Sequence, residues 1–184
     1  MADIRPPLPV KMFIGMISAE PALFDACASV LTAHYGPLDF KSEVLPWNRT
    51  DYYRNEMGSE LYRMFLFFER LMDPGTLPSL KHFTNALERT FAVPAGHGLR
   101  RKINLDPGYV TEAKVVLATA KDFAHRIYIG EELYAEVTLR YNMKDRSFAP
   151  HEYTYPDYDS ETYLALFNRV RKNLRTALHK TDRR

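Results

Sequence analysis

Acidic, basic and imidazole side chains gather in the segment 104–136, where they could hold an anion or move a proton. We assign catalytic roles to Asp106, His125 and Glu136, because carboxylate and imidazole groups exchange protons in enzymes. The residues assigned to ligand binding, in this segment and beyond it, are Gly108, Tyr109, Thr111, Lys114, Lys121, Arg126, Thr138, Tyr155 and Asp157.

The anion hypothesis depends on an expected turn followed by a helix. Asp106-Pro107-Gly108 has the residues of a turn, because proline presets φ and glycine accepts a positive φ. Thr111 would then cap a helix over residues 111–120, and the free N–H groups at such a terminus attract anions. Lys114, one turn into that helix, would add positive charge.

The same residues allow other interpretations. Asp106, Asp122, His125 and Glu136 could hold a divalent metal, since carboxylate and imidazole suit several metals. Arg126 opposite Glu136 could instead be an ordinary cross-strand pair worth about 0.2–1 kcal/mol, with His125 in the core. We assign no metal ligand, and the sequence names no cofactor.

A second candidate consists of two aromatic segments, Trp47–Tyr53 and His151–Tyr158, each with an Asp-Tyr pair. Their rings could stack on a base or a sugar. They could equally pack over one end of the core and hydrogen-bond to the backbone.

Several common catalytic patterns are absent. The chain lacks the Gly-x-x-x-x-Gly-Lys-Ser/Thr phosphate loop, the Gly-x-Gly-x-x-Gly fingerprint, His-Glu-x-x-His, Cys-x-x-Cys and the Gly-x-Ser-x-Gly elbow. Cys27 is the only cysteine, so no internal disulfide forms, and its place on an apolar helical stripe predicts an inert core thiol. With no signal peptide and no apolar run of about 20 residues, we expect a cytoplasmic protein without a membrane partner.

The elements that must position these residues follow from apolar spacing. Lys11–Ile17 and Leu61–Leu71 are apolar on both parities, which predicts two strands buried on both faces and adjacent in the sheet centre. Helical stripes follow each of them, and Leu38–Leu45 and Arg100–Leu105 alternate like half-exposed strands. The resulting order, β-α-β-β-α-β, is the ferredoxin-like order.

The remaining residues must cover the second face of the sheet. They predict the helix over 111–120, a hairpin over Phe123–Tyr141 with one polar face, and a long C-terminal helix. A three-residue loop, Gly130–Glu132, would place Arg126 opposite Glu136. We predict one α+β domain over residues 1–184: a ferredoxin-like core with a mostly antiparallel sheet, elaborated by an extra helix, a hairpin and a long helix, with an extended arm (1–10) and a basic tail (179–184).

The positive charge is concentrated at one end. Residues 168–184 contain seven Lys or Arg and one acid, which leaves 18 basic and 22 acidic residues elsewhere. A nucleic-acid-binding protein usually has a basic body, so this distribution argues against a nucleic-acid partner. Cations near a helix C-terminus have a simpler explanation in the helix dipole.

Several segments resemble an uncharacterised prokaryotic family, domain of unknown function 4416, over Lys11–Leu174. They are Lys11-Met-Phe-Ile-Gly-Met-Ile, Thr50-Asp-Tyr-Tyr, Asn104-Leu-Asp-Pro-Gly-Tyr, Lys114–Asp122, His125-Arg-Ile-Tyr, Tyr134-Ala-Glu-Val-Thr-Leu and Tyr155-Pro-Asp-Tyr. The resemblance implies a stand-alone prokaryotic cytosolic protein and brings no reaction, cofactor or catalytic residue.

The function that the residues favour is a small-molecule enzyme or binding protein whose ligand is a phosphate- or carboxylate-bearing metabolite or nucleotide. One alternative is an interaction module that binds RNA through the basic helix and exposed aromatic residues. Another is an assembly protein without a pocket. Steep weakening of binding by salt would distinguish the RNA-binding module.

Overall fold

The chain forms one large β-sheet, one small hairpin and a few helices, in a computed structural model that describes residues 3–47, 54–96 and 98–181. The large sheet contains β1 (Val10–Ser18), β2 (Leu38–Lys41), β3 (Leu45–Trp47), β4 (Leu61–Met72), β7 (Ile103–Val110), β8 (Lys114–Thr119), β9 (Ile127–Gly130), β10 (Leu133–Asn142) and β11 (Ser147–Ala149). The other elements are α1 (Ala22–Tyr35), α2 (Arg54–Met57), the short 3₁₀ turn η1 (Pro74–Thr76), α3 (Leu77–Phe91), the pair β5 (Val93–Ala95) and β6 (Gly98–Arg100), and α4 (Glu161–Thr181).

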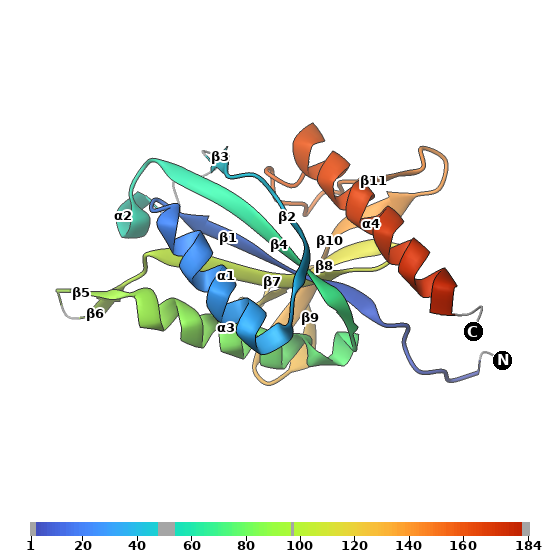
Figure 1. Ribbon diagram of the computed structural model, residues 1–184, viewed down its shortest axis with the longest axis horizontal. Coiled ribbons are helices and arrows are strands. Elements are labelled where there is room, and N and C mark those ends of the chain that lie inside the picture. Colours follow the sequence, from blue (N-terminus) through green and yellow to red (C-terminus); the bar gives the residue numbers. More distant parts are fainter. Residues whose placement is uncertain (1–2, 48–53, 97, 182–184) are drawn as a thin grey trace.

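The strands of the large sheet follow the order β11-β10-β8-β7-β1-β4-β2, with β3 beside β4 and β9 beside β10. Every pairing is antiparallel, which confirms the predicted α+β class with a mostly antiparallel sheet. Figure 1 shows α1 and α3 on one face of this sheet and α4 on the other. The described part of the sheet has nine strands because β8 and β10 extend it beyond β7.

The two strands predicted at the centre, β1 and β4, are adjacent, with Ile14 opposite Leu66. All nine residues of β1 are buried. Their side chains alternate between two clusters: Ile14 packs under α1 and α3, whereas Phe13 packs against Phe167 of α4. The apolar pattern on both parities therefore arises because helices cover both faces.

The C-terminal helix supplies the predicted cover for the second face. Its stripe of Tyr163, Phe167, Val170 and Leu174 is buried. Two of its cations also pack on aromatic rings, with the guanidinium of Arg169 4.2 Å from the Phe40 ring and that of Arg171 3.3 Å from the Tyr141 ring. The basic helix therefore uses part of its charge in packing and does not present all of it to solvent.

The helix predicted over residues 111–120 is wrong. Residues 114–119 form β8 instead, and Thr111 accepts hydrogen bonds from the N–H groups of Ala113 and Lys114 in a tight turn. The run Val115–Ala118 is buried, with Val115 on the α4 side and Val116 on the side of α1 and α3. A short apolar run without periodicity is compatible both with a helix and with a strand buried on both faces. Here the strand forms because both faces of the sheet are covered by helices.

The turn predicted at Asp106-Pro107-Gly108 is also wrong, because these residues lie inside β7, opposite Gly15, Ile14 and Phe13. Gly108 is required by space and not by a positive φ. A Cβ atom there would lie 2.3 Å from the carbonyl oxygen of Val116 and 2.7 Å from the Phe13 ring. The anion site expected at a helix N-terminus therefore does not exist.

The predicted hairpin forms, with Ile127 opposite Ala135 and Tyr128 opposite Tyr134 as expected. Its turn is tighter than predicted, because Glu131 and Glu132 have positive φ values of 54° and 62° and Leu133 pairs with Gly130. A second irregularity lies between Val137 and Leu139 of β10. One extra residue reverses the alternation of a strand, so the predicted single polar face is lost.

Three smaller boundaries also differ from the prediction. The arm ends at residue 9, the segment Leu38–Leu45 divides into β2 and the start of β3, and Arg100–Leu105 divides between the end of β6 and the start of β7. Cys27 is fully buried as expected. In the residues that the structure describes, none of the helices is long and apolar enough to cross a membrane.

Candidate functional site

A cavity of about 430 Å³ opens where β7 and β8 separate, beside α3 and the loop before α4. Eight charged side chains line it, four of each sign: Arg63, Lys81, Arg101, Lys121, Glu88, Asp106, Glu136 and Asp157. The other lining residues are Ile17, Trp47, Asn85, Asn104, Leu117, Ala118, Thr119, Ala120, Tyr155, Pro156 and Tyr158. Most of the lining residues are therefore charged or polar, and apolar residues such as Ile17, Leu117 and Ala118 complete the wall.

The gap between the two strands begins at a proline. β7 pairs with β8 only from Gly108 to Val110, whereas it pairs with β1 along its whole length. Pro107 has no N–H to donate to a neighbouring strand. The pairing of β7 with β8 starts only at the next residue, Gly108. The segment from Ile103 to Pro107 and the end of β8 thus diverge and leave the cavity between them.

Arg63 forms the base of the cavity on β4. Its Nη2 atom lies 3.0 Å from Asp157 Oδ2 and 3.9 Å from Asp106 Oδ2, and Trp47 Nε1 donates to the same Asp157 oxygen at 3.0 Å. Burial alone lowers the pKa of the Arg63 guanidinium, but the charges of Tyr158, Asp157 and Asp106 together raise this pKa by more. The net shift is upward, so Arg63 remains cationic. Trp47 and Asp157, one residue from each of the two aromatic segments predicted as a separate site, therefore lie in the same cavity as Asp106 of the first candidate.

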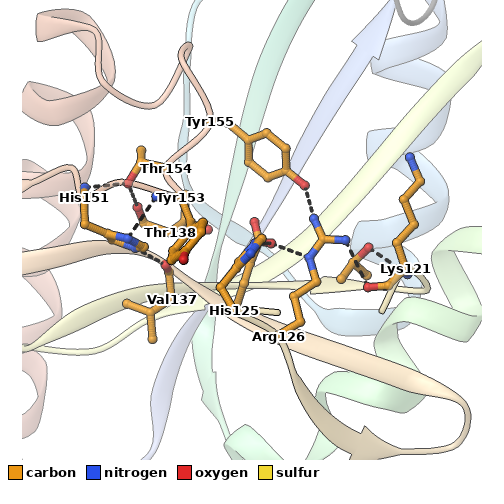
Figure 2. Close-up of polar contacts among 11 residues, drawn as sticks. Lys121, His125, Arg126, Val137, Thr138, His151, Tyr153, Thr154 and Tyr155 are labelled. Atoms are coloured by element: carbon orange, nitrogen blue, oxygen red, sulfur yellow. Dashed lines mark hydrogen bonds and ion pairs between the residues drawn. The ribbon is translucent and has the colours of Figure 1, made fainter. Parts of the chain in front are cut away.

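Glu136, another lining residue, belongs to a buried polar cluster. Figure 2 shows three other members of the cluster, His125, Arg126 and Tyr155. Glu136 Oε2 accepts from Arg126 Nε at 2.7 Å and from His125 Nε2 at 3.1 Å. Arg126 also donates to the carbonyl of Lys121 at 3.0 Å and to the Tyr155 hydroxyl at 2.7 Å. The predicted neighbours Arg126 and Glu136 are thus joined, but inside the protein and not on a solvated face.

The loop 151–158 is held to β10 by its own polar groups, which Figure 2 also shows. Thr154 donates to the carbonyl of Thr138 at 2.6 Å, and His151 Nε2 donates to that of Val137 at 2.5 Å. The Tyr153 ring stacks on His125 with centroids 4.4 Å apart and planes at 8°. These contacts fix the loop that carries Tyr155 into the cavity wall.

The Tyr155 hydroxyl lies in an acidic part of the cavity. Burial, followed by the charge of Glu136, raises the pKa of Tyr155 to about 12, although Arg126 opposes the shift. Asp106 and Asp157 act in the same direction as Glu136. Tyr155 therefore keeps its proton at neutral pH and can donate it in a hydrogen bond.

The wall formed by α3 and the start of β7 is richer in cations. Lys81 Nζ donates to the carbonyl of Leu105 at 3.0 Å, and Arg101 Nη1 lies 3.7 Å from Glu88 Oε2. Burial raises the pKa of Glu88, although Lys81, the N–H of Leu105 and Arg101 oppose it. On this wall, two cations lie near one carboxyl group whose ionisation is disfavoured.

Polar atoms without a partner concentrate at this cavity. Four buried side-chain atoms of the described residues have no hydrogen bond, and three of them belong to lining residues: Arg63 Nε, Asn104 Nδ2 and Glu136 Oε1. The fourth is Thr138 Oγ1. Buried polar groups are usually satisfied, so unpartnered atoms in a cavity wall indicate that a ligand or water completes them.

Of the residues that the sequence analysis assigned, Asp106, Lys121, Glu136, Tyr155 and Asp157 line the cavity, and His125 and Arg126 contact Glu136 from outside it. The other five lie elsewhere: Gly108, Tyr109, Thr111, Lys114 and Thr138. Lys114 is exposed at the opposite end of β8, and Tyr109 packs on the cluster under α1 and α3. The prediction that Lys114 joins Asp106, Arg126 and Glu136 at one concavity is therefore wrong.

Sequence reasoning missed Arg63, Lys81, Glu88, Arg101 and Asn104. Arg63 had a usable signal, because a charged residue inside an otherwise apolar central strand must have buried partners. Within the described ranges, no three His, Cys, Asp or Glu side chains gather as a metal site, although His125 and Glu136 do touch. Residues 48–53 of the first aromatic segment, Asp51 and Tyr52 among them, lie outside the described residues.

Comparison with known proteins identifies the family. No curated protein and no solved structure matches the chain. A family model does match, over residues 8–174, which is most of the chain and contains every residue of the cavity wall. The chain belongs to the family described as domain of unknown function 4416 (DUF4416).

Proposed function

We propose that this protein binds a small metabolite in the cavity between β7 and β8, as an enzyme or as a binding protein, and that the ligand carries a carboxylate or phosphate group. The volume of about 430 Å³ falls within the range of roughly 300–1,000 Å³ typical of small-molecule sites. The cationic lining residues Lys81, Arg101 and Lys121 support an acid group on the ligand.

The observation that carries the proposal is the set of unpartnered atoms. Arg63 Nε and Asn104 Nδ2 are donors without acceptors, and each lies in a residue that lines the cavity. A buried donor without a partner costs about 1–3 kcal/mol, more for a charged group. Oxygen acceptors of a ligand would relieve that cost, which favours a ligand with acid or carbonyl groups.

The pair of His125 and Glu136 is the part of the site best suited to acid–base chemistry. Glu136 lines the cavity, and His125 contacts its second oxygen from the outer side. Because His125 Nε2 donates to that oxygen, it stabilises the ionised carboxylate, which is the form of Glu136 that can take a proton from a bound molecule. Asp106 lines the cavity near Arg63 and takes the role of a binding group.

The experiment that tests the proposal compares two exposed lysines at opposite ends of β8. Purified protein is titrated calorimetrically with inorganic phosphate and with a panel of carboxylate metabolites, sugar phosphates and nucleotides. We expect Lys121→Ala to weaken binding about tenfold, the effect of losing one charged hydrogen bond, while Lys114→Ala has no effect. Equal loss in both variants, or no binding of any compound, would refute the proposed site.

We also assign β1, α1, β2, β4, α3 and β7 to a ferredoxin-like core. The strand order β7-β1-β4-β2 and the two helical connections on one face support this assignment. A cytoplasmic location is proposed on the buried lone thiol of Cys27 and the resemblance to a prokaryotic cytosolic family. Fractionation of cells from which the protein was cloned would test the location.

A further inference from the structure

The cavity has two ends of opposite electrostatic character. Lys81 and Arg101 stand on the side of α3 and the start of β7, whereas Asp106, Glu136 and Asp157 lie around the Tyr155 hydroxyl. The ligand acid group proposed above accounts for the first end only. The carboxylate end has no role in that proposal.

Accepting the pocket of the proposed function, we propose that its ligand also carries a protonated amine, or an equivalent N–H cation, which binds at Glu136 and Asp106. The ligand class is therefore a zwitterion with an amino group at one end and an acid group at the other. The argument rests on Glu136, on Asp106 and on the charge balance between them.

Glu136 has one oxygen occupied and one unoccupied. Oε2 accepts from Arg126 and His125, neither of which lines the cavity, whereas Glu136 itself does. Oε1 has no partner, although the Glu136 side chain is only 2% exposed. The unpartnered atom is a pure acceptor when the carboxylate is ionised, so the group that completes it must be a donor.

The Asp106 carboxylate is the second one at this end with room for a further hydrogen bond. Its only ion pair among the described residues is with Arg63 at 3.9 Å, beyond hydrogen-bond distance, and its side chain is 26% exposed. Asp157, in contrast, accepts from both Arg63 and Trp47 at 3.0 Å and is already satisfied. Asp106 is therefore the second acceptor open to a ligand.

The carboxylates at this end outnumber the guanidinium groups that they contact. Asp106, Glu136 and Asp157 face Arg63 and Arg126, with the neutral Tyr155 phenol between them, and His125 adds a positive charge only when it is protonated. One positive ligand group at this end would restore neutrality in a poorly hydrated space, where an unbalanced charge is costly. Lys81 and Arg101, on the side of α3, would hold the acid group of the same molecule.

The test uses three matched probes: n-butylammonium, butyrate and 4-aminobutyrate, each titrated at constant ionic strength while the backbone amide shifts of Asn104, Ala118 and Glu136 are followed by NMR. We expect butylammonium and 4-aminobutyrate to shift these amides in the wild-type protein. Asp106→Asn should weaken both about tenfold and leave butyrate unchanged. Glu136→Gln should do the same, and Asp106→Asn serves as the independent variant, since Glu136→Gln also disturbs the buried pair with Arg126.

The outcomes separate the two proposals. Binding of butyrate without butylammonium would overturn the amine site and leave the acid-binding pocket standing. Failure of every probe, and of the metabolite panel, to shift these amides would overturn both. Weakening of butyrate and butylammonium to the same degree in Asp106→Asn would also overturn the inference, because the carboxylate would then act on the pocket as a whole.

Discussion

Arg126 Nε lies 2.7 Å from Glu136 Oε2, and neither side chain is more than 3% exposed. A surface pair of this kind contributes little, but breaking a buried pair leaves an uncompensated charge in the interior. This geometry makes the pair an element of stability as well as a wall of the site.

Arg126→Met is accordingly expected to lower the free energy of unfolding by about 3–5 kcal/mol in urea titrations followed by circular dichroism. The matched control is Lys41→Met, because Lys41 pairs with Asp25 at 3.1 Å with both side chains largely exposed, at 47% and 76%. Lys41→Met should lower the free energy of unfolding by less than about 1 kcal/mol. Similar losses in the two variants would show that burial of the Arg126 pair has no energetic consequence.

Gly108→Ala is expected to destabilise the protein by about 1–3 kcal/mol or more, because the new Cβ meets a backbone carbonyl and the Phe13 ring. Gly98→Ala is the control, since nothing lies within 4 Å of a Cβ built there. Thermal unfolding of both variants measures the difference. A Gly108→Ala protein as stable as Gly98→Ala would contradict the close approach of β7, β8 and β1.

Cys27 should resist modification while the protein is folded. Burial, and to a lesser degree the charge of Glu88, raise the pKa of its thiol from 9.0 to about 12. With Ellman's reagent at about pH 8, near the ordinary thiol pKa, we expect slow labelling of the native protein and rapid labelling in urea. Rapid labelling of the folded chain would place the thiol outside the core.

The same shift fixes the direction of a pH effect on stability. The thiol ionises near 9.0 in the unfolded chain and at about 12 in the folded one, so its contribution is complete below pH 9.0 and is lost as the pH rises toward 12. Cys27→Ala should therefore flatten the fall in stability over this alkaline range. The free energy of unfolding is measured by urea titration at several alkaline pH values. If it falls as steeply with pH in Cys27→Ala as in the wild-type protein, the assignment is contradicted.

Deletion of residues 179–184 should change the melting temperature by less than about 5 °C. The one ion pair of this tail among the described residues joins His179 Nε2 to Glu112 Oε1 at 3.6 Å, and the two side chains are 59% and 37% exposed. Leu174→Ala, at a fully buried position of the same helix, is the comparison and should cost about 2–5 kcal/mol. A truncation as damaging as Leu174→Ala would mean that the tail is part of the packed helix.

The parts of the fold that sequence predicts are those with a clear period. Ile14 and Leu66 were placed on central strands because apolar residues occur on both parities, and Phe167 was placed on a helical stripe. Val116 was assigned to a helix because four apolar residues in a row have no period that distinguishes a helix from a buried strand. Val116 lies in a strand because β7 and β10 pair with β8 on its two sides, which are contacts between distant parts of the chain.

The site was predictable only where its residues are close in the chain. Arg126 and Glu136 were paired correctly from the hairpin spacing. Arg63 and Asp157 are 94 residues apart and meet only through the tertiary fold, which a single sequence does not report. Asp106 was found, but for the wrong local reason, since it lies in a strand and not in a turn.

The separation of β7 from β8 at Pro107 has a consequence for how a ligand would associate. Among the described residues, β7 and β8 border the hollow, and both strands are fixed when the sheet forms. A preorganised site of this kind loses little conformational entropy on binding, so its association rate should be limited by diffusion into the opening and not by a slow rearrangement of the protein.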